Sequence, residues 1–485
     1  MSVEEHVQRF KNWINSKSNL EIKKHQVDGI RWIFKRELSP PLGSPGGFLC
    51  DEMGLGKTIL MLGSIVCNLK QRTLIVMPNS LLAQWEEAIQ RFLGESITPL
   101  VYHGEVARDF TVEQISRYPI VITTYGMVSK RKDETYRSKL WELEWGRVIY
   151  DEAHHLRNKG TRLYDGVMNH IRSEIKWMVT GTPINNDKSD FYNLCVIQGM
   201  SKSFSLSAKQ IRQVVEDCVL KRTKAQVGIE MPELKENIVD VYFETEKEEL
   251  FAKNIHNLMS FANVTTDNVD QIISSMGANL QSRFPVLMLM RQCCVYPRLA
   301  VKYFMKKFRK QAKSLDLKKT FEKMTHSKIN AVVRKIEENK NNGKKKLVFC
   351  LFIKEMERLQ KVLEKKGISC GSVSGSTPKK MRERLLRKPE EGEESPDVLI
   401  VQIQTACEGL NLQHISEVYF TTPHWNPAVE DQAIARAHRI GQENDVDVYR
   451  FIRRFTTKDD DHSITLDEYC MNIQEKKREI AKMIS

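Results

Sequence analysis

The sequence predicts an α/β protein with two parallel-sheet units and a mainly α-helical segment between them. From residue 45 to 185, short apolar runs alternate with helix-like stretches, and the same alternation resumes at about residue 326. Between about 205 and 325 the chain is instead helix-like and rich in Met and Lys. Apolar strands separated by helical patterns are typical of a parallel sheet that is covered on both faces.

Five strands are expected in the first unit. They are the continuous apolar runs at residues 47–50, 73–77, 120–123, 147–150 and 176–179. In parallel sheets the functional residues gather at the carboxyl ends of the strands. Two motifs lie at such ends, DEMGLGKT at residues 51–58 and DEAH at residues 151–154.

The first motif has the features of a phosphate-binding loop. Gly54 and Gly56 allow the backbone N–H groups to point at phosphate oxygens, Lys57 can reach the terminal phosphates, and Thr58 can ligate magnesium. The strict pattern has glycine where this chain has Asp51. The candidate nucleotide-binding residues of this segment are Asp51, Glu52, Met53, Gly54, Leu55, Gly56, Lys57 and Thr58.

The second motif places two carboxylates at the end of a strand. Asp151 is positioned to hold magnesium, and Glu152 to orient and deprotonate an attacking water molecule. Taken alone, DEAH is equally compatible with an acidic surface turn. Its position after an apolar strand and downstream of GKT favours the catalytic interpretation.

The second unit is expected to contain strands at residues 346–350, 398–401, 417–420 and 447–451, and the chain is expected to end in an amphipathic helix over 467–485. Before these strands lies a basic block. Residues 302–346 contain sixteen Lys or Arg and four Asp or Glu. Such a block suits a polyanion such as a phosphate backbone, although a solvated helical face would have the same composition.

Composition narrows the class of protein. The chain has 485 residues, of which 41% are hydrophobic and 28% charged, and a net charge of +13. It has no apolar run long enough to span a membrane and no signal-peptide core near its start, so an intracellular, soluble protein is expected. The ten cysteines include no CxxC pair, so no structural zinc is expected.

Further segments match a known family in sequence order. They are KHQVDGIRW from Lys24, LIVMPNSLLAQW, ITTYGMV and TGTPINN in the first unit, and KLVFCLF, TACEGLNL and WNPAVEDQAIARAHRIGQ in the second. Together with DEMGLGKT and DEAH, they resemble the Swi/Snf family of helicase-like ATPases, within helicase superfamily two. The resemblance covers residues 20–475. It implies two recombinase-like lobes, an ATP-binding lobe at 1–205 and a C-terminal lobe at 326–485, with an α-helical insert at 206–325.

The resemblance also suggests roles for individual residues. Arg436 and Arg439 resemble arginine fingers, and their spacing predicts that they share one helical face and reach one phosphate together. Gln26 resembles the glutamine that reads adenine, and Gln432 a residue that faces the nucleotide. The remaining matches are Thr180, Gly181 and Thr182 for coupling hydrolysis to lobe movement, and Pro78, Thr123, Thr124, Asn411 and Trp425 for contacts near DNA. Packing is an equally good interpretation of Trp425.

One departure from the family concerns Cys407 and Glu408, which stand where the family usually carries two glycines. Glu408 adds a carboxylate near an expected phosphate-contacting loop. The sequence leaves open whether this side chain points away or weakens a contact.

The resemblance implies an ATP- and magnesium-dependent motor that moves along double-stranded DNA and remodels protein–DNA complexes, with a protein client on the DNA. Two alternatives stay open, a strand-separating DNA or RNA helicase and a nucleic-acid-binding scaffold without turnover. The expected location is the nucleus or another DNA-containing compartment in a eukaryote, or a viral replication site. The client, the source and the oligomeric state are not indicated by the sequence.

Overall fold

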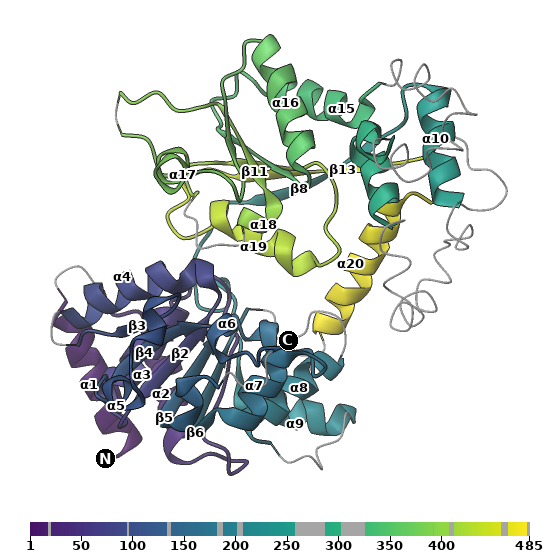
Figure 1. Cartoon of the computed structure of the whole chain (residues 1–485). Coiled ribbons are helices and arrows are strands. Elements are labelled where there is room, and N and C mark those ends of the chain that lie inside the picture. Colours follow the sequence, from purple (N-terminus) through teal and green to yellow (C-terminus); the bar gives the residue numbers. More distant parts are fainter. Residues whose placement is uncertain are drawn as a thin grey trace. The chain divides into compact units, whose positions relative to one another are not determined.

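The computed structural model describes residues 1–17, 21–94, 97–132, 137–181, 188–200, 207–257, 287–301, 325–390, 392–406, 412–456 and 464–482. The chain forms two compact units (Figure 1). The first comprises Met1–Glu230 together with Glu479–Ser485, and the second comprises Met231–Arg478. Each is built around one sheet whose described strand pairs are all parallel. The predicted α/β class with two parallel-sheet lobes is therefore confirmed.

The sheet of the first unit has seven strands in the order β3-β4-β2-β5-β6-β1-β7. Its strands are β1 (Gly46–Leu49), β2 (Thr73–Met77), β3 (Leu100–Tyr102), β4 (Ile120–Thr124), β5 (Glu144–Asp151), β6 (Arg172–Val179) and β7 (Val219–Leu220). Its α-helices are α1 (Val3–Asn15), α2 (Lys24–Leu38), α3 (Lys57–Cys67), α4 (Leu82–Leu93), α5 (Val112–Ser116), α6 (Tyr125–Val128), α7 (Arg162–His170), α8 (Lys188–Gln198) and α9 (Ala208–Cys218).

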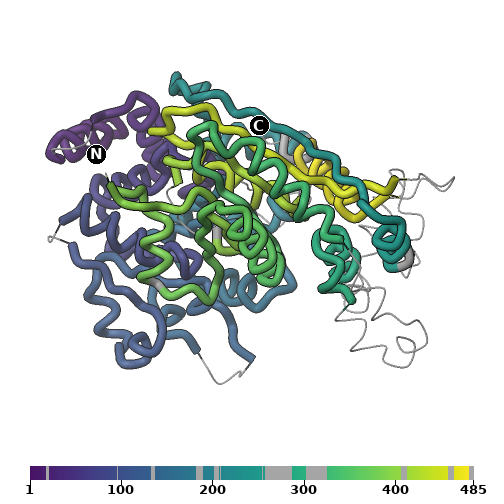
Figure 2. Tube along the Cα trace, turned by 90° about the horizontal axis from the view of Figure 1, so that it is seen from above, coloured from purple at the N-terminus to yellow at the C-terminus, as the bar shows by residue number. Residues whose placement is uncertain are grey.

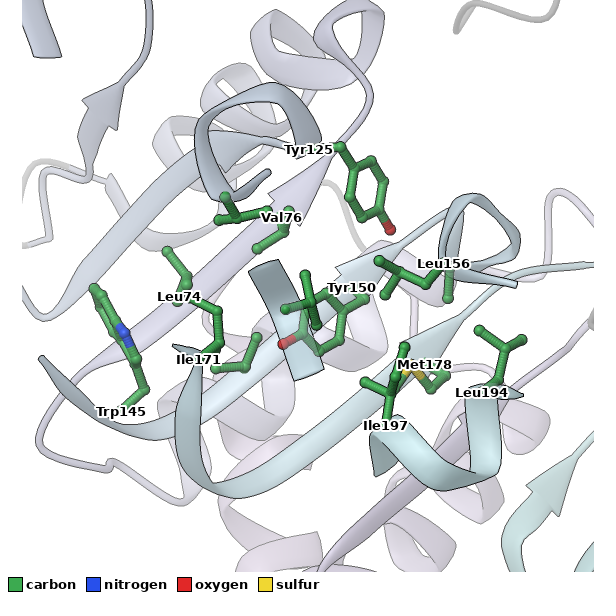
Figure 3. Close-up of a cluster of buried hydrophobic side chains, with 14 of the residues drawn as sticks. Leu74, Val76, Tyr125, Trp145, Tyr150, Leu156, Ile171, Met178, Leu194 and Ile197 are labelled. Carbon is green, nitrogen blue, oxygen red and sulfur yellow. The ribbon is translucent and has the colours of Figure 1, made fainter. Parts of the chain in front are cut away.

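Alternate residues of these strands face two separate hydrophobic cores. Helices α1 to α4 cover one face, where Ile75 and Ile149 are fully buried, and α1 packs beside α2 at the purple end of the trace (Figure 2). Helices α7 to α9 cover the other face. Leu74, Val76 and Tyr150 lie in the core on that face, which Figure 3 shows in part. Burial on both faces explains why these strands are continuous apolar runs in the sequence.

The sheet of the second unit has six strands in the order β10-β11-β9-β12-β13-β8. Its strands are β8 (Leu234–Val241), β9 (Lys346–Cys350), β10 (Cys370–Val373), β11 (Val398–Gln402), β12 (Glu417–Phe420) and β13 (Val446–Arg453). Its labelled helices are α10 (Glu246–Asn257), α15 (Ser327–Glu338), α16 (Ile353–Lys365), α17 (Lys379–Leu386), α18 (Ile403–Ala406), α19 (Pro427–Ala437) and α20 (Leu466–Lys482).

The nine predicted strands are all present, and four further strands, β3, β7, β8 and β10, were not predicted. Two of them lie in the segment 206–325 that was expected to be an α-helical insert. β7 pairs with β1 in the first sheet, and β8 pairs with β13 in the second. This segment therefore supplies an edge strand to each unit, and the chain passes from the first unit to the second between Glu230 and Met231.

Residues 302–324 of the basic block lie outside the described residues, as do Thr182, Cys407, Glu408 and Asn411. Within the described ranges, no helix is long and apolar enough to cross a membrane. The same ranges contain no group of three or more His, Cys, Asp or Glu side chains that could hold a metal ion.

Candidate nucleotide site

Three neighbouring strands bring the predicted motifs to one edge of the first sheet. β5, β6 and β1 lie side by side, with Asp151 in register with Val179 and Leu49 in register with the same residue. DEMGLGKT follows β1, DEAH begins with the last residue of β5, and Thr180 follows β6. The N–H of Thr180 donates to the carbonyl of Leu49 at 3.2 Å, which ties two of these strand ends together.

The phosphate loop has the backbone shape that its glycines predict. Gly54 and Gly56 adopt φ values of 93° and 86°, a left-handed conformation that favours glycine. Gly56 caps α3 without a side-chain hydrogen bond to the helix, so the first N–H groups of α3 face the loop. Lys57 Nζ donates to the carbonyl of Asp51 at 2.7 Å, which places its ammonium group over the loop. A helix N-terminus with a lysine beside it is suited to phosphate.

Three of the predicted nucleotide-binding residues of the loop have side chains that are buried or that contact another segment of the chain. Asp51 is fully buried and its carboxylate accepts from Arg222, with Nη2 at 2.5 Å. Glu52 pairs with Lys224 Nζ at 2.9 Å. Leu55 is fully buried, so only its backbone faces the loop. The departure at Asp51 thus has a physical reason, since this carboxylate binds another segment of the chain.

Gln26 lies against the phosphate loop. It is buried on α2, and a Cβ atom added at Gly56 would lie 3.0 Å from its Nε2. The neighbouring His25 Nε2 lies 3.3 Å from the carbonyl of Leu55. The structure therefore brings the predicted adenine-reading residue next to the loop.

The two carboxylates of DEAH are held in different ways. Asp151 accepts a hydrogen bond from the indole of Trp85 at 2.7 Å and from the N–H of Glu152 at 3.0 Å. Tyr125, whose hydroxyl is drawn in Figure 3, donates to the carbonyl of Asp151 at 2.7 Å. Glu152 has φ 51° and ψ 50° and is the one non-glycine residue with positive φ among those described. Such backbone strain is concentrated at functional sites and requires surrounding contacts that hold it.

A chain of polar contacts connects Glu152 to the coupling segment. Glu152 Oε2 lies 3.2 Å from His154 Nδ1, and His154 Nδ1 lies 3.3 Å from the hydroxyl of Thr180. Thr180 is fully buried and Gly181 has open space around its Cα. The predicted water-activating residue and the start of the predicted coupling segment are therefore joined through one histidine.

The residues at this site fit a divalent cation. Burial and the adjacent charge of Glu152 raise the pKa of Asp151 to about 6. A carboxylate in this position would be stabilised in its charged form by a positive ion. The Thr58 hydroxyl in the first turn of α3 and the Asp151 carboxylate supply the hard oxygen ligands that magnesium prefers.

The residues predicted to lie near DNA differ in their surroundings. Pro78 follows β2 and precedes the turn at Asn79–Leu81. Thr123 is fully buried and donates to the carbonyl of Tyr102 at 2.7 Å, and the Thr124 hydroxyl lies 3.2 Å from His103 Nδ1. Both hydroxyls bond within the unit, which disfavours a direct contact with DNA through them.

Trp425 supports the alternative interpretation, packing within the second unit. Its ring lies 6.1 Å from that of Tyr469 in an edge-on arrangement, and the guanidinium of Arg291 lies 5.4 Å from its centroid. The carbonyl of Trp425 accepts from Lys477 at 3.1 Å.

The predicted arginine pair is arranged differently from the expectation. α19 ends at Ala437, so Arg436 lies in its last turn and Arg439 in the turn that follows. The prediction that both share one helical face was wrong, because His438 leaves helical geometry with φ −86° and ψ 77°. Arg436 is buried, and desolvation lowers the pKa of Arg439. Gln432 lies on the same helix and is partly exposed.

Sequence reasoning missed four residues that shape the site. They are Trp85, Tyr125, Arg222 and Lys224. Trp85 lies in an amphipathic helix, where a tryptophan usually indicates core packing. Its partner is 66 positions away, and only the strand order shows that they meet.

A glycine-rich loop at the end of β1 and paired carboxylates at the end of β5, on either side of β6, are followed by a second parallel-sheet unit. These features define a two-unit protein that binds a nucleoside triphosphate. Comparison with known families identifies it further. Residues 25–299, more than half of the chain, match the SNF2-related domain, and residues 327–441 match the helicase conserved C-terminal domain. The chain belongs to the SNF2-related, or Swi/Snf, family of helicase-like ATPases.

Similar proteins include the chromatin structure-remodeling complex protein SYD of Arabidopsis thaliana, which is 26% identical over 89% of this chain and 12% of its own length. An uncharacterized ATP-dependent helicase of Mycoplasma genitalium is 26% identical over 98% of this chain and 43% of its own. A probable global transactivator of the Orgyia pseudotsugata multicapsid polyhedrosis virus is 27% identical over 93% of this chain and 89% of its own length. The chain thus spans less than half the length of the first two.

Among solved structures, the chain is similar to the Sulfolobus solfataricus SWI2/SNF2 ATPase core in complex with double-stranded DNA. That likeness has a TM-score of 0.41 and 23% identity over 90% of this chain and 89% of the other.

Proposed function

We propose that this protein hydrolyses ATP with magnesium and uses the energy to move along double-stranded DNA, remodelling protein–DNA complexes. The observation that carries the proposal is the meeting of Lys57, Asp151 and Glu152 at the ends of β1 and β5. Membership in the SNF2-related family supports duplex DNA as the track. The net charge of +13 is compatible with that polyanion.

In the proposed mechanism, the loop N–H groups and Lys57 bind the β- and γ-phosphates, and Gln26 contacts the base beside Gly56. Magnesium, held by Thr58 and Asp151, would neutralise phosphate charge when bound. Glu152 accepts a proton from the attacking water, and its strained backbone fixes the direction of the carboxylate. Arg436 and Arg439 of the second unit stabilise the charge that develops on the transferred phosphoryl group.

DNA contacts are proposed to be made mainly with phosphates, so movement would not depend on base sequence. Pro78 and the turn after it remain candidates for the DNA track, and Asn411 is a further one. The protein would act on a DNA-bound client in a compartment that contains DNA, the nucleus in a eukaryote or a replication site in a virus.

The proposal is tested by ATP turnover without nucleic acid and with single-stranded DNA, duplex DNA or RNA. Duplex DNA should stimulate turnover most. Glu152→Gln should bind ATP without hydrolysing it, and Lys57→Ala should lose binding or turnover. Displacement of a third strand from a DNA triplex measures translocation, and a labelled duplex measures strand separation. Stronger stimulation by RNA or single strands would contradict the proposed track, and normal turnover by Glu152→Gln would contradict the proposed base.

A further inference from the structure

A short segment distant in sequence from DEMGLGKT and DEAH is bound to the phosphate loop. Residues 220–224 continue β7 alongside the loop, where the N–H of Cys50 donates to the carbonyl of Leu220 at 2.7 Å. The N–H of Glu52 donates to the carbonyl of Arg222 at 2.9 Å. This repeats the spacing of a parallel ladder, so the loop begins as an extension of the sheet.

Arg222 forms an ion pair with the carboxylate of Asp51 at the start of the loop. Its Nη2 lies 2.5 Å from Asp51 Oδ2, its Nε lies 3.0 Å from Oδ1, and its own N–H donates to Oδ1 at 3.0 Å. A fully buried carboxylate must be paired to remain charged, and a two-pronged guanidinium contact fixes its direction as well.

The same guanidinium also reaches the helix that carries Gln26. Arg222 Nη1 donates to the carbonyl of His25 at 2.5 Å. Residue 29 must be small for this approach, since a Cβ atom at Gly29 would lie 2.8 Å from Arg222 Nη2. The Arg222 side chain therefore bonds both to the start of α2 and to the start of the phosphate loop.

Lys224 makes a second, separate attachment. Its Nζ lies 2.9 Å from Glu52 Oε1 and its N–H donates to Glu52 Oε2 at 2.8 Å. The lysine side chain is 5% exposed and that of Glu52 is 40% exposed, so the pair lies at the edge of the buried region. A Cβ atom at Gly54 would lie 3.8 Å from Lys224 Cε, which places the lysine stem beside the left-handed turn of the loop.

The attached segment leads into the second unit. A turn at residues 223–229 is closed by the N–H of Ile229, which donates to the carbonyl of Lys224 at 3.0 Å. One residue later, after Glu230, the chain passes into the second unit at Met231. The start of the linker is thus held by the phosphate loop.

We propose that Arg222 and Lys224 form a clasp, defined by their contacts with Asp51, Glu52 and the carbonyl of His25. The clasp holds the phosphate loop in its ATP-binding shape and fixes the beginning of the inter-unit linker to it. Both residues are positioning residues, because their described contacts go to the chain and not to the reacting groups. This inference rests on the proposed ATP-driven movement and adds a route by which the loop and the linker act together.

The test compares Arg222→Lys and Lys224→Met with two matched controls that break exposed ion pairs in the same unit. Arg31→Lys alters the pair between Arg31 on α2 and Glu4 on α1, and Lys70→Met removes the pair with Glu174. ATP affinity is measured in the Glu152→Gln background by titration with a fluorescent ATP analogue. Triplex displacement per ATP hydrolysed is measured with Glu152 intact, and melting temperature reports on folding.

Each clasp variant should raise the Kd for ATP about tenfold, equivalent to about 1.4 kcal/mol, and should lower displacement per ATP hydrolysed. The controls should change neither. Unchanged affinity and unchanged coupling in both variants, with an active wild-type motor, would overturn the clasp and leave the proposed function intact. Failure of the wild-type protein to bind ATP would overturn both. If Arg222→Lys fails to fold, the same measurements on Lys224→Met test the clasp. This variant should fold, because Glu52 is partly exposed and can be solvated when its partner is lost.

Discussion

At the scale of single residues, the site depends on neighbours that orient its carboxylates. The carboxylate of Asp151 accepts a hydrogen bond from the indole of Trp85, and the backbone carbonyl of Asp151 accepts one from the hydroxyl of Tyr125. Glu152 is fixed by a left-handed backbone and by His154. The two adjacent carboxylates therefore have different partners, which fits the different roles proposed for them, Asp151 on the metal ion and Glu152 on the attacking water.

Replacing Trp85 with Phe should raise the magnesium requirement of ATP turnover. Phe keeps most of the buried volume but removes the indole N–H that donates to Asp151, and a hydrogen bond to a charged group contributes about 1.5–3 kcal/mol. The magnesium concentration for half-maximal turnover should increase about tenfold. A magnesium titration of turnover measures this, together with binding of magnesium–ATP in the Glu152→Gln background.

The matched control is Trp145→Phe at the opposite end of β5, where the indole donates to the carbonyl of Leu140 at 3.1 Å. This variant should lose stability without changing the magnesium requirement. An equal magnesium dependence in the two variants would show that Trp85 serves only to fill the core.

At the scale of elements, the end of α19 separates two arginines that the sequence spacing places together. Arg436 is held by a buried helix, whereas Arg439 follows the helix in a turn. Arg436→Lys and Arg439→Lys should each lower the turnover number by about 10²- to 10³-fold, because lysine keeps the charge but loses the forked geometry. ATP affinity should change less than about threefold in each, since fingers act mainly in the transition state.

Single-turnover kinetics with duplex DNA measure this effect. Arg478→Lys is the control, because Arg478 pairs with Asp431 of α19 at 2.8 Å on an exposed surface. Normal turnover by Arg436→Lys or Arg439→Lys would remove that residue from the proposed set of fingers.

The contact between α10 and α20 should make the second unit sensitive to acid. His256 on α10 is buried, with Nδ1 2.7 Å from the carbonyl of Ala252, and its Nε2 accepts from the N–H of Leu466 at 3.1 Å. This requires the neutral ring, and burial lowers the pKa of His256 to about 4. The unfolded chain, with an ordinary pKa of about 6.5, binds the proton first as pH falls.

The histidine therefore contributes stability that is fully present above pH 6.5 and is lost as pH falls toward its folded-state pKa of about 4. At about pH 5 the loss is about 2 kcal/mol. Urea unfolding of wild type and His256→Gln at about pH 7.5 and about pH 5 measures it. The variant should show the smaller decrease between the two pH values, and an equal decrease would assign the acid sensitivity to other groups.

The elements that the sequence predicts best are those buried on both faces. The apolar runs before DEMGLGKT and DEAH indicate β1 and β5 directly. β8 was missed because it is an edge strand in which Lys235, Glu236 and Asn237 are exposed, so its composition resembles a loop. β7 was missed because it has only two residues. The loop and both carboxylates follow from local motifs, whereas the contacts of Trp85 and Arg222 depend on strand order and cannot be found from spacing.

At the scale of the whole molecule, the two units have separate cores and divide at Glu230 and Met231. All described residues of the phosphate loop and of DEAH belong to the first unit, whereas both proposed fingers belong to the second. Binding of ATP and its hydrolysis should therefore depend differently on the linker between the units.

A flexible Gly/Ser insertion between Glu230 and Met231 should separate these two steps. ATP affinity should stay within about twofold, because each doubling of a loop costs only about 0.6 kcal/mol and the phosphate loop, Gln26 and Asp151 all lie before the insertion. DNA-stimulated turnover should fall progressively as the insertion lengthens from about 5 to about 20 residues, since the effective concentration of the second unit's arginines falls with linker length. The same insertions after Gly392, in an exposed loop of the second unit, should leave turnover unchanged. Turnover that is independent of the length at residue 230 would mean that the fingers come from another copy of the chain, and mixing Lys57→Ala with Arg436→Lys protein would then restore activity.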